Sequence, residues 1–278
     1  MGDNLLAVAR GEVDVAVSTP AGFARMAVAG QGPFAAEPLT GLRAIGCLPH
    51  RDALLIAVSA ECDIKTFAQL REQRPALRVA LSPDDGESFM GLGAAAAFAA
   101  AGVPLSEIVA WGGELLLCER PHDCVALVLD GRADAIAQEA IMTPAWDELA
   151  TRRPLTFLSL DAESERDLEA RLSLGTVTVD AGFLSGMDEP VRAVDFRDWM
   201  VVVRADLRDD VAGLLATIMT ESGEALERQY RHIPVRFSPL DYPITPQRLA
   251  DTPIALHPGA EDHYRSIGVD HRRGETVA

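Results

Sequence analysis

The sequence of 278 residues lacks the features that mark several large classes of protein. No apolar run reaches the roughly 18 residues that a membrane-spanning helix needs. Residues 1–4 have neither the basic start nor the apolar run of a signal peptide. Basic residues are scarce, because 25 Lys and Arg against 42 Asp and Glu give a formal net charge of −17. Phosphate contacts come from Lys and Arg, so this balance argues against nucleic acid as a partner and against direct insertion into an anionic membrane.

Cysteine and catalytic motifs are also scarce. The four cysteines, Cys47, Cys62, Cys118 and Cys124, form no C-x-x-C pair, and no histidine cluster has the spacing of a zinc site. We expect small buried thiols, with a Cys118–Cys124 disulfide as an open alternative. The motifs G-x-S-x-G, H-E-x-x-H and G-x-x-x-x-G-K-[ST] are missing, and Gly91–Gly93 lies within a predicted helix. We therefore predict no metal, no cofactor and no enzymatic activity, although distant residues could still form a triad.

What is present is an alternation of apolar strands with Ala-rich helices, which predicts an α/β fold with mostly parallel sheets. The predicted strands are 13–17, 42–48, 54–58, 78–81, 108–111, 135–138, 155–159 and a strand within 194–203. The predicted helices are 4–11, 65–72, 89–101, 121–129, 144–151, 162–172, 208–231 and 259–267. The pattern favours two lobes, one formed by 1–58 and 196–278 and the other by 59–195. Two extended connections, near 50–58 and 195–203, would cross between them as a hinge.

The segment Pro253–Arg265 (PIALHPGAEDHYR) is the most specific stretch of the sequence. It resembles the C-terminal signature of the TAXI family, the extracytoplasmic solute receptors of TRAP-type transporters. Further segments resemble that family in the same order: Gly11–Ala16, Ile64–Leu70, Asp85–Ser88, Asp130–Ala135, Ala181–Asp188 and Val203–Leu207. Two departures are the absence of the family's signal, first strand and first loop ahead of Asn4, and Glu87 in place of a small residue.

The resemblance implies a two-lobed periplasmic-binding-protein fold of the second type. It also implies a periplasmic location and a monomer that closes around its solute by hinge motion. The solute would be a small organic anion, a carboxylate or an amino acid, held in a cleft between the lobes. The partners would be the membrane subunits of a TRAP transporter.

The loop Ser82–Ser88 is the best candidate for contacting such a solute. It joins a strand to the start of a helix, where free backbone N–H groups attract a carboxylate. Gly86 would let the backbone approach the ligand, and Ser82 and Ser88 offer hydroxyl groups. Simple capping by Asp85 or Ser88 is the alternative. The acids Asp85 and Glu87, with Asp84, could instead hold an ammonium group.

Other candidates lie at strand ends and in the predicted crossings. Arg51 could bind a carboxylate with its planar guanidinium, or be a solvated turn arginine. Ser18 and Thr19 end a strand that we predict to be parallel, where open α/β sheets bind ligands; the alternative is that they cap a helix or a turn. Glu139 ends another such strand and could take an amino group, or be a solvent-facing carboxylate in a loop.

The remaining candidates are weaker. Trp199 could line the cleft or lie in the core of a strand. Gly182 is added by the resemblance, and His257 looks structural. Two rival functions stay open: an enzyme on the same fold, such as a decarboxylase or a thiamine-precursor synthase, and a ligand-sensing domain of a regulator.

Overall fold

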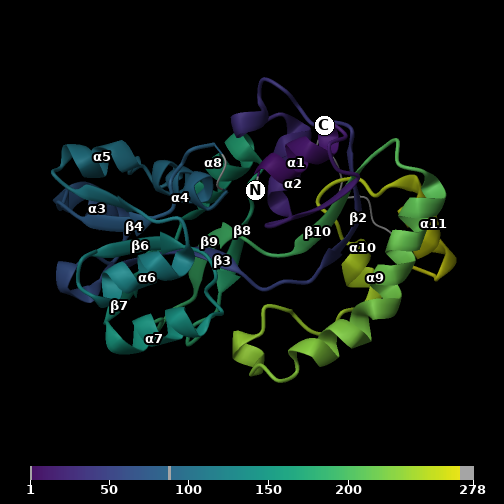
Figure 1. Cartoon of the computed structure of the whole chain (residues 1–278). Helices are drawn as coiled ribbons and strands as arrows, with labels where there is room; N and C mark the ends of the chain where they lie inside the picture. Colours follow the sequence, from purple (N-terminus) through teal and green to yellow (C-terminus); the bar gives the residue numbers. More distant parts are fainter. Residues whose placement is uncertain (1, 87–88, 270–278) are drawn as a thin grey trace. The chain divides into compact units, whose positions relative to one another are not determined.

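The computed structural model describes residues 2–86 and 89–269, and the chain divides into two compact units (Figure 1). Unit 1 consists of Met1–Arg51 and Phe196–Ala278, and unit 2 consists of Asp52–Asp195. The chain therefore passes between the units twice, after Arg51 and after Asp195. The predicted boundary after residue 58 falls inside strand β3 (Ala53–Ser59), which pairs with β6, β7 and β9 of unit 2.

Unit 1 is built on a 3-stranded antiparallel sheet in the order β1-β10-β2. Its strands are β1 (Val15–Ser18), β10 (Trp199–Arg204) and β2 (Leu42–Leu48). The prediction of a buried, parallel β1 is wrong. β1 pairs antiparallel with β10 at the edge of the described sheet, and Val15 and Val17 are 39% and 48% exposed. A short apolar run does not reveal whether its strand is central or at an edge.

The helices of unit 1 pack against this sheet and against one another. They are α1 (Gly2–Ala9), α2 (Gly22–Ala29), α9 (Asp209–Tyr230), α10 (Pro246–Ala250) and α11 (Pro258–Ser266), with 3₁₀ turns at Gly32–Phe34 and Val235–Phe237. The C-terminal signature brings α11 close to α9, because a Cβ on Gly259 would lie 2.1 Å from the carbonyl oxygen of Asp209. His257 is buried and its Nδ1 accepts a hydrogen bond from the backbone N–H of Gly259 at 3.2 Å. His257 therefore caps α11, and its interpretation as a structural residue is confirmed.

Unit 2 contains a 7-stranded sheet in the order β5-β4-β6-β3-β9-β8, with β7 also pairing with β3. Its strands are β3, β4 (Arg78–Leu81), β5 (Glu114–Leu117), β6 (Ala135–Gln138), β7 (Leu155–Phe157), β8 (Thr176–Val179) and β9 (Val191–Asp195). The α/β class is confirmed. Among the described ladders of unit 2, those joining β5, β4 and β6 are parallel and the others are antiparallel. The sheets are thus mixed rather than mostly parallel, because only the connections through α4, α5 and α6 have the length and form of βαβ crossovers.

The helices of unit 2 are α3 (Phe67–Gln73), α4 (Phe89–Ala100), α5 (Leu105–Ala110), α6 (Pro121–Leu129), α7 (Pro144–Arg152) and α8 (Ala162–Leu172), with a 3₁₀ turn at Ala60–Cys62. The strand predicted at 108–111 is wrong, since Ile108 lies in α5 and the strand β5 follows later. Pro104 precedes α5, and Gly112, with φ of 93°, turns the chain after it. A short apolar run fits a helix and a strand equally well. Among the described residues, no helix combines the length and apolarity that a membrane span requires.

Candidate functional site

The carboxyl ends of β4 and β6 form a switch point in the topology of unit 2. After β4 the chain runs to β5, which pairs with β4 on the side away from β6. After β6 it runs through α7 to β7, which pairs with β3 on the opposite side of the sheet. Loops that leave adjacent parallel strands in opposite directions open a crevice, and ligands of open α/β sheets bind there. Ser82 and Glu139, two predicted site residues, directly follow these strands.

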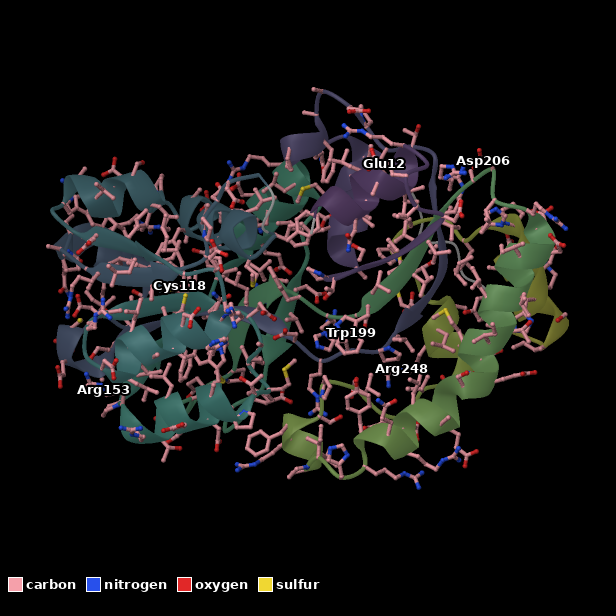
Figure 2. The ribbon with its side chains drawn as sticks, in the orientation of Figure 1. Glu12, Cys118, Arg153, Trp199, Asp206 and Arg248 are labelled. Carbon is pink, nitrogen blue, oxygen red and sulfur yellow. The ribbon has the colours of Figure 1, made fainter. Side chains whose placement is uncertain are left out.

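Gln138 joins the two strand ends. Its Nε2 donates to Ser82 Oγ at 3.0 Å and to Cys124 Sγ at 3.4 Å, while its Oε1 accepts from the backbone N–H of Glu139 at 3.1 Å. Ser82 and Gln138 are 1% and 0% exposed. Both amide hydrogens are thus used, so Gln138 fixes the Ser82 hydroxyl and the start of the following loop. Cys118, labelled in Figure 2, directly follows β5, and its Sγ donates to the carbonyl oxygen of Leu116 at 3.6 Å.

Asp52 holds the loop that follows β6. Its Oδ1 accepts from the backbone N–H groups of Ala53 at 2.7 Å and Ile141 at 3.2 Å, and its Oδ2 accepts from that of Ala140 at 3.1 Å. These bonds stabilise Ala140 in the left-handed region, at φ of 62°. Burial raises the pKa of Asp52 well above its usual value, and the hydrogen bond to Glu139 raises it further. Burial beside the carboxyl group of Glu139 therefore favours the protonated form of Asp52.

The loop after β4 carries negative charge. Burial, and then the charge of Asp85, raise the pKa of Asp84. Gly86 has φ of 81° and open space around it, as expected for a residue that leaves the backbone accessible. A Cβ on Gly91 would lie 1.8 Å from the carbonyl oxygen of Pro83, so Gly91 lets this loop lie directly on α4. The predicted site residues Glu87 and Ser88 lie outside the described residues. The acidic side chains near β4 and β6 favour an ammonium group over a carboxylate.

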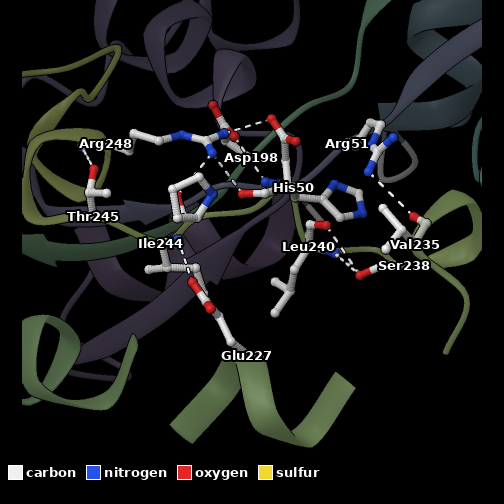
Figure 3. A network of polar contacts seen from close by, with 12 residues as sticks. His50, Arg51, Asp198, Glu227, Val235, Ser238, Leu240, Ile244, Thr245 and Arg248 are labelled. Atoms are coloured by element: carbon white, nitrogen blue, oxygen red, sulfur yellow. Dashed lines mark hydrogen bonds and ion pairs between the residues drawn. The ribbon is translucent and has the colours of Figure 1, made fainter. Parts of the chain in front are cut away.

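A second group of polar residues lies in unit 1 around His50 (Figure 3). The backbone N–H of His50 donates to Asp198 Oδ1 at 3.0 Å, and the backbone N–H of Asp198 donates to the carbonyl oxygen of His50 at 3.2 Å. Asp198 is in the left-handed region, at φ of 65°. This turn places Trp199 on the imidazole ring of His50, with the ring centroids 4.5 Å apart and the planes at 23°.

His50 and Arg51 each hold a buried nitrogen atom that has no hydrogen-bond partner among the described residues, His50 Nδ1 and Arg51 Nε. Burial lowers the pKa of His50 from 6.5 to about 4, against a hydrogen bond to the backbone of Phe196 that raises it. The ring is therefore neutral at pH 7. In a neutral imidazole one ring nitrogen carries the hydrogen and the other accepts, so the tautomer decides whether His50 Nδ1 donates or accepts. Arg51 Nε can only donate, whereas the neutral His50 ring can present Nδ1 as an acceptor in one of its two tautomers.

The segment 235–243 contacts His50 and Arg51 and is itself fixed by hydrogen bonds. Arg51 Nη2 donates to the carbonyl oxygen of Val235 at 3.4 Å, and His50 forms a β-bridge with Leu240. Arg248 donates from Nη2 to Asp241 Oδ2 at 2.7 Å and from Nη1 to two backbone carbonyl oxygens of the same segment (Figure 3). These contacts fix the segment and thereby the positions of both unpartnered nitrogens.

The structure brings some of the predicted residues together and leaves others apart. Ser18 pairs with Met200 across β1 and β10, so Ser18 and Thr19 lie beside Trp199. Ser18 Oγ donates to the carbonyl oxygen of Pro20 at 3.4 Å, as the capping alternative expects. Gly182, at φ of 77°, donates its N–H to Met187 at 2.7 Å and closes a turn between β8 and β9. The sequence did not predict His50, Asp52, Gln138 or Asp198 as site residues, although a polar run follows the apolar strand β2.

The whole of residues 1–268 matches the family model described as the NMT1-like family. The chain belongs to the NMT1-like family. No curated protein matches this NMT1-like chain.

Several solved structures are similar to this NMT1-like chain at low identity. XAC2383 from Xanthomonas citri bound to ATP has a TM-score of 0.49 at 17% identity, covering 98% of this chain and 84% of that one. PhnD1 from Prochlorococcus marinus (MIT 9301) in complex with methylphosphonate has 0.48 at 10% identity, covering 95% and 81%. The glycine/betaine/L-proline-binding protein ProX from Borrelia burgdorferi has 0.41 at 10% identity, covering 85% and 76%. None of them bears on the ligand of this chain.

Proposed function

We propose that this NMT1-like protein is an extracytoplasmic solute-binding receptor and that its solute is a small amino acid or a closely related carboxylate. The observation that carries the proposal is the pair of buried, unpartnered nitrogens on His50 and Arg51. A buried polar group without a partner costs about 1–3 kcal/mol, so such a pair is expected where a ligand completes the bonding. Arg51 Nε–H suits a carboxylate oxygen, and neutral His50 Nδ1 suits an ammonium or hydroxyl group.

Two further features support a binding role. The aromatic face of Trp199 supplies an apolar wall beside the donor and acceptor, which is the usual composition of a small-molecule site. The switch point of unit 2 provides a second candidate group, Ser82 and Glu139, whose acidic surroundings also favour an ammonium group.

The class of transporter that this receptor serves is a separate part of the proposal. The resemblance of Pro253–Arg265 to the TAXI signature supports a TRAP-type system, in which the receptor is periplasmic and delivers its solute to membrane subunits. Co-purification of the solute-loaded protein with TRAP-type membrane subunits tests this part. If the solute-loaded protein instead co-purifies with an ABC-type transporter, the receptor belongs to that class.

A thermal-shift and calorimetry screen with amino acids, monocarboxylates and dicarboxylates tests the solute class. An amino acid should raise the melting temperature with concentration. Arg51→Lys, which keeps the charge but loses the planar donor, should weaken binding at least tenfold, since a charge-assisted hydrogen bond contributes about 1.5–3 kcal/mol. His50→Phe should weaken amino acids more than their des-amino analogues. Glu139→Gln reports separately on the switch-point group.

The receptor proposal fails if no carboxylate binds, or if Arg51→Lys and Glu139→Gln both bind like the wild type. Turnover of a bound acid, followed by NMR over hours, would replace it with the enzyme alternative. Arg10→Lys provides a matched control, because Arg10 is an exposed arginine of unit 1 paired with Glu37 at 3.4 Å.

A further inference from the structure

The end of α9 and the 3₁₀ turn that follows it form a basic surface on a protein that is acidic overall. Residues 228–237, the basic tip, contain no Asp or Glu, whereas the whole chain has a formal net charge of −17. Val235 lies between the last two basic side chains of the tip and is 66% exposed. The basic side chains, all of them exposed, are Arg228, Arg231, His232 and Arg236.

The acidic residues next to the basic tip are bonded elsewhere or only weakly paired. Glu227 Oε1 accepts a hydrogen bond from a backbone N–H at 2.7 Å, and Asp241 Oδ2 pairs with Arg248 at 2.7 Å. Arg228 lies 3.7 Å from Glu224, but both side chains are more than half exposed, at 57% and 79%, and such pairs contribute little. The arginines near the end of α9 therefore remain available to a partner.

We propose that the basic tip docks on a carboxylate-rich surface of a protein partner. An arginine guanidinium forms two parallel hydrogen bonds with a carboxylate, and the exposed Val235 suits an apolar position beside such a pair. A bilayer of anionic lipids fits less well, because it faces the whole molecule and repels a net charge of −17. A small acidic patch meets only the tip, since exposed charges beyond a Debye length of about 8 Å are screened.

The basic tip continues into the backbone segment that fixes the candidate solute site. The carbonyl oxygen of Val235 accepts from Arg51 Nη2 at 3.4 Å (Figure 3), and that of Pro239 accepts from the backbone N–H of Arg51 at 3.0 Å. Leu240 forms a β-bridge with His50. Docking that moves the tip therefore moves the acceptors of Arg51 and lowers the affinity for solute, and bound solute weakens docking by the same factor. This second step rests on the proposed function, whereas docking itself does not.

An NMR titration of the ¹⁵N-labelled, solute-free protein with octaglutamate tests the docking step. The peptide should shift the backbone amide signals of the basic tip, with an affinity that falls as the salt concentration rises. Arg228→Gln combined with Arg231→Gln should weaken the binding of octaglutamate about tenfold. The matched control combines Arg132→Gln with Arg166→Gln, which removes the same charge from exposed arginines of unit 2 and should leave that affinity within threefold of the wild type.

The same titration tests the coupling through the Nε–H signal of Arg51, which is assigned by its loss in Arg51→Lys. That signal should shift together with the tip signals in the wild type and stay unchanged in the variant that lacks Arg228 and Arg231. A shift of the tip without a shift of Arg51 would overturn the coupling.

Three results would overturn the docking proposal. The first is that octaglutamate leaves the tip signals unchanged, and the second is that both double variants bind the peptide as the wild type does. The third is that the protein ignores the peptide but sediments with vesicles of phosphatidylglycerol and phosphatidylcholine, which would assign the tip to lipid. If octaglutamate docks but no carboxylate or amino acid binds, the proposed function fails and docking stands. If such solutes bind and octaglutamate does not, docking fails and the proposed function stands.

Discussion

Replacing His50 with phenylalanine should flatten the pH dependence of the free energy of unfolding between about pH 4 and 6.5. Burial lowers the pKa of His50 from 6.5 to about 4, so the folded protein holds the ring neutral where the unfolded chain binds a proton. At about 1.36 kcal/mol per pKa unit, this shift contributes about 3 kcal/mol to stability. The contribution is fully present above the unfolded pKa and is lost as the pH falls towards the folded pKa.

Phenylalanine keeps the ring stacked on Trp199 but cannot titrate. His50→Phe should therefore lose a roughly constant 1 kcal/mol with the bond to Phe196 and become less destabilised, relative to the wild type, as the pH falls. Urea unfolding at several pH values measures the difference, and an NMR titration of the His50 ring gives the pKa directly. His232→Gln, at an exposed histidine, should leave the wild-type slope unchanged. A wild-type-to-variant difference that is the same at both ends of the pH range would refute the reasoning.

Two other substitutions give direct checks. Asp52→Ala removes the acceptor of three backbone N–H groups and should cost about 3 kcal/mol, with faster hydrogen exchange at Ala140 and Ile141. Because burial raises the pKa of Asp52, wild-type stability should fall as the pH rises from the unfolded pKa through the folded one. Asp52→Asn should remove that slope, and an unchanged slope in this variant would contradict the raised pKa. Gly259→Ala places a Cβ 2.1 Å from the carbonyl oxygen of Asp209, so it should lower the melting temperature and leave the solute affinity unchanged. A loss of solute binding without a loss of stability would instead give the segment Pro253–Arg265 a direct role in binding.

The elements that the sequence predicted best are helices with a clear local signal at their N-terminus. Helix α8 was placed correctly at Ala162–Leu172, and Asp161 caps it by accepting from Glu163 at 3.1 Å and Ser164 at 2.8 Å. Helix α6 begins with Pro121 at its first turn and was also placed correctly. By contrast, the apolar runs at Val15 and Ile108 carried no signal that separates a central strand from an edge strand or a helix.

The candidate site was only partly visible from sequence because its key contacts join distant residues. Arg51 and Ser82 could be selected as polar residues after apolar strands. The role of Asp52 depends on backbone groups at Ala140 and Ile141, and that of His50 depends on Asp198. No periodicity or spacing encodes such pairings, which arise only once the sheets bring the strand ends together.

Unit 2 is in effect an insertion whose two ends are adjacent. Ala53 pairs directly with Asp195, so the first and last strands of unit 2 close on each other. In unit 1 the backbone N–H of Asp198 donates to the carbonyl oxygen of His50, so the two chain segments that flank unit 2 are hydrogen-bonded to each other. We therefore expect that residues 52–195 can be excised as a single domain, and that residue 51 can be joined to residue 196 by a short linker. Each product would retain its own sheet, which makes the two halves separable for labelling, crystallisation and exchange between relatives.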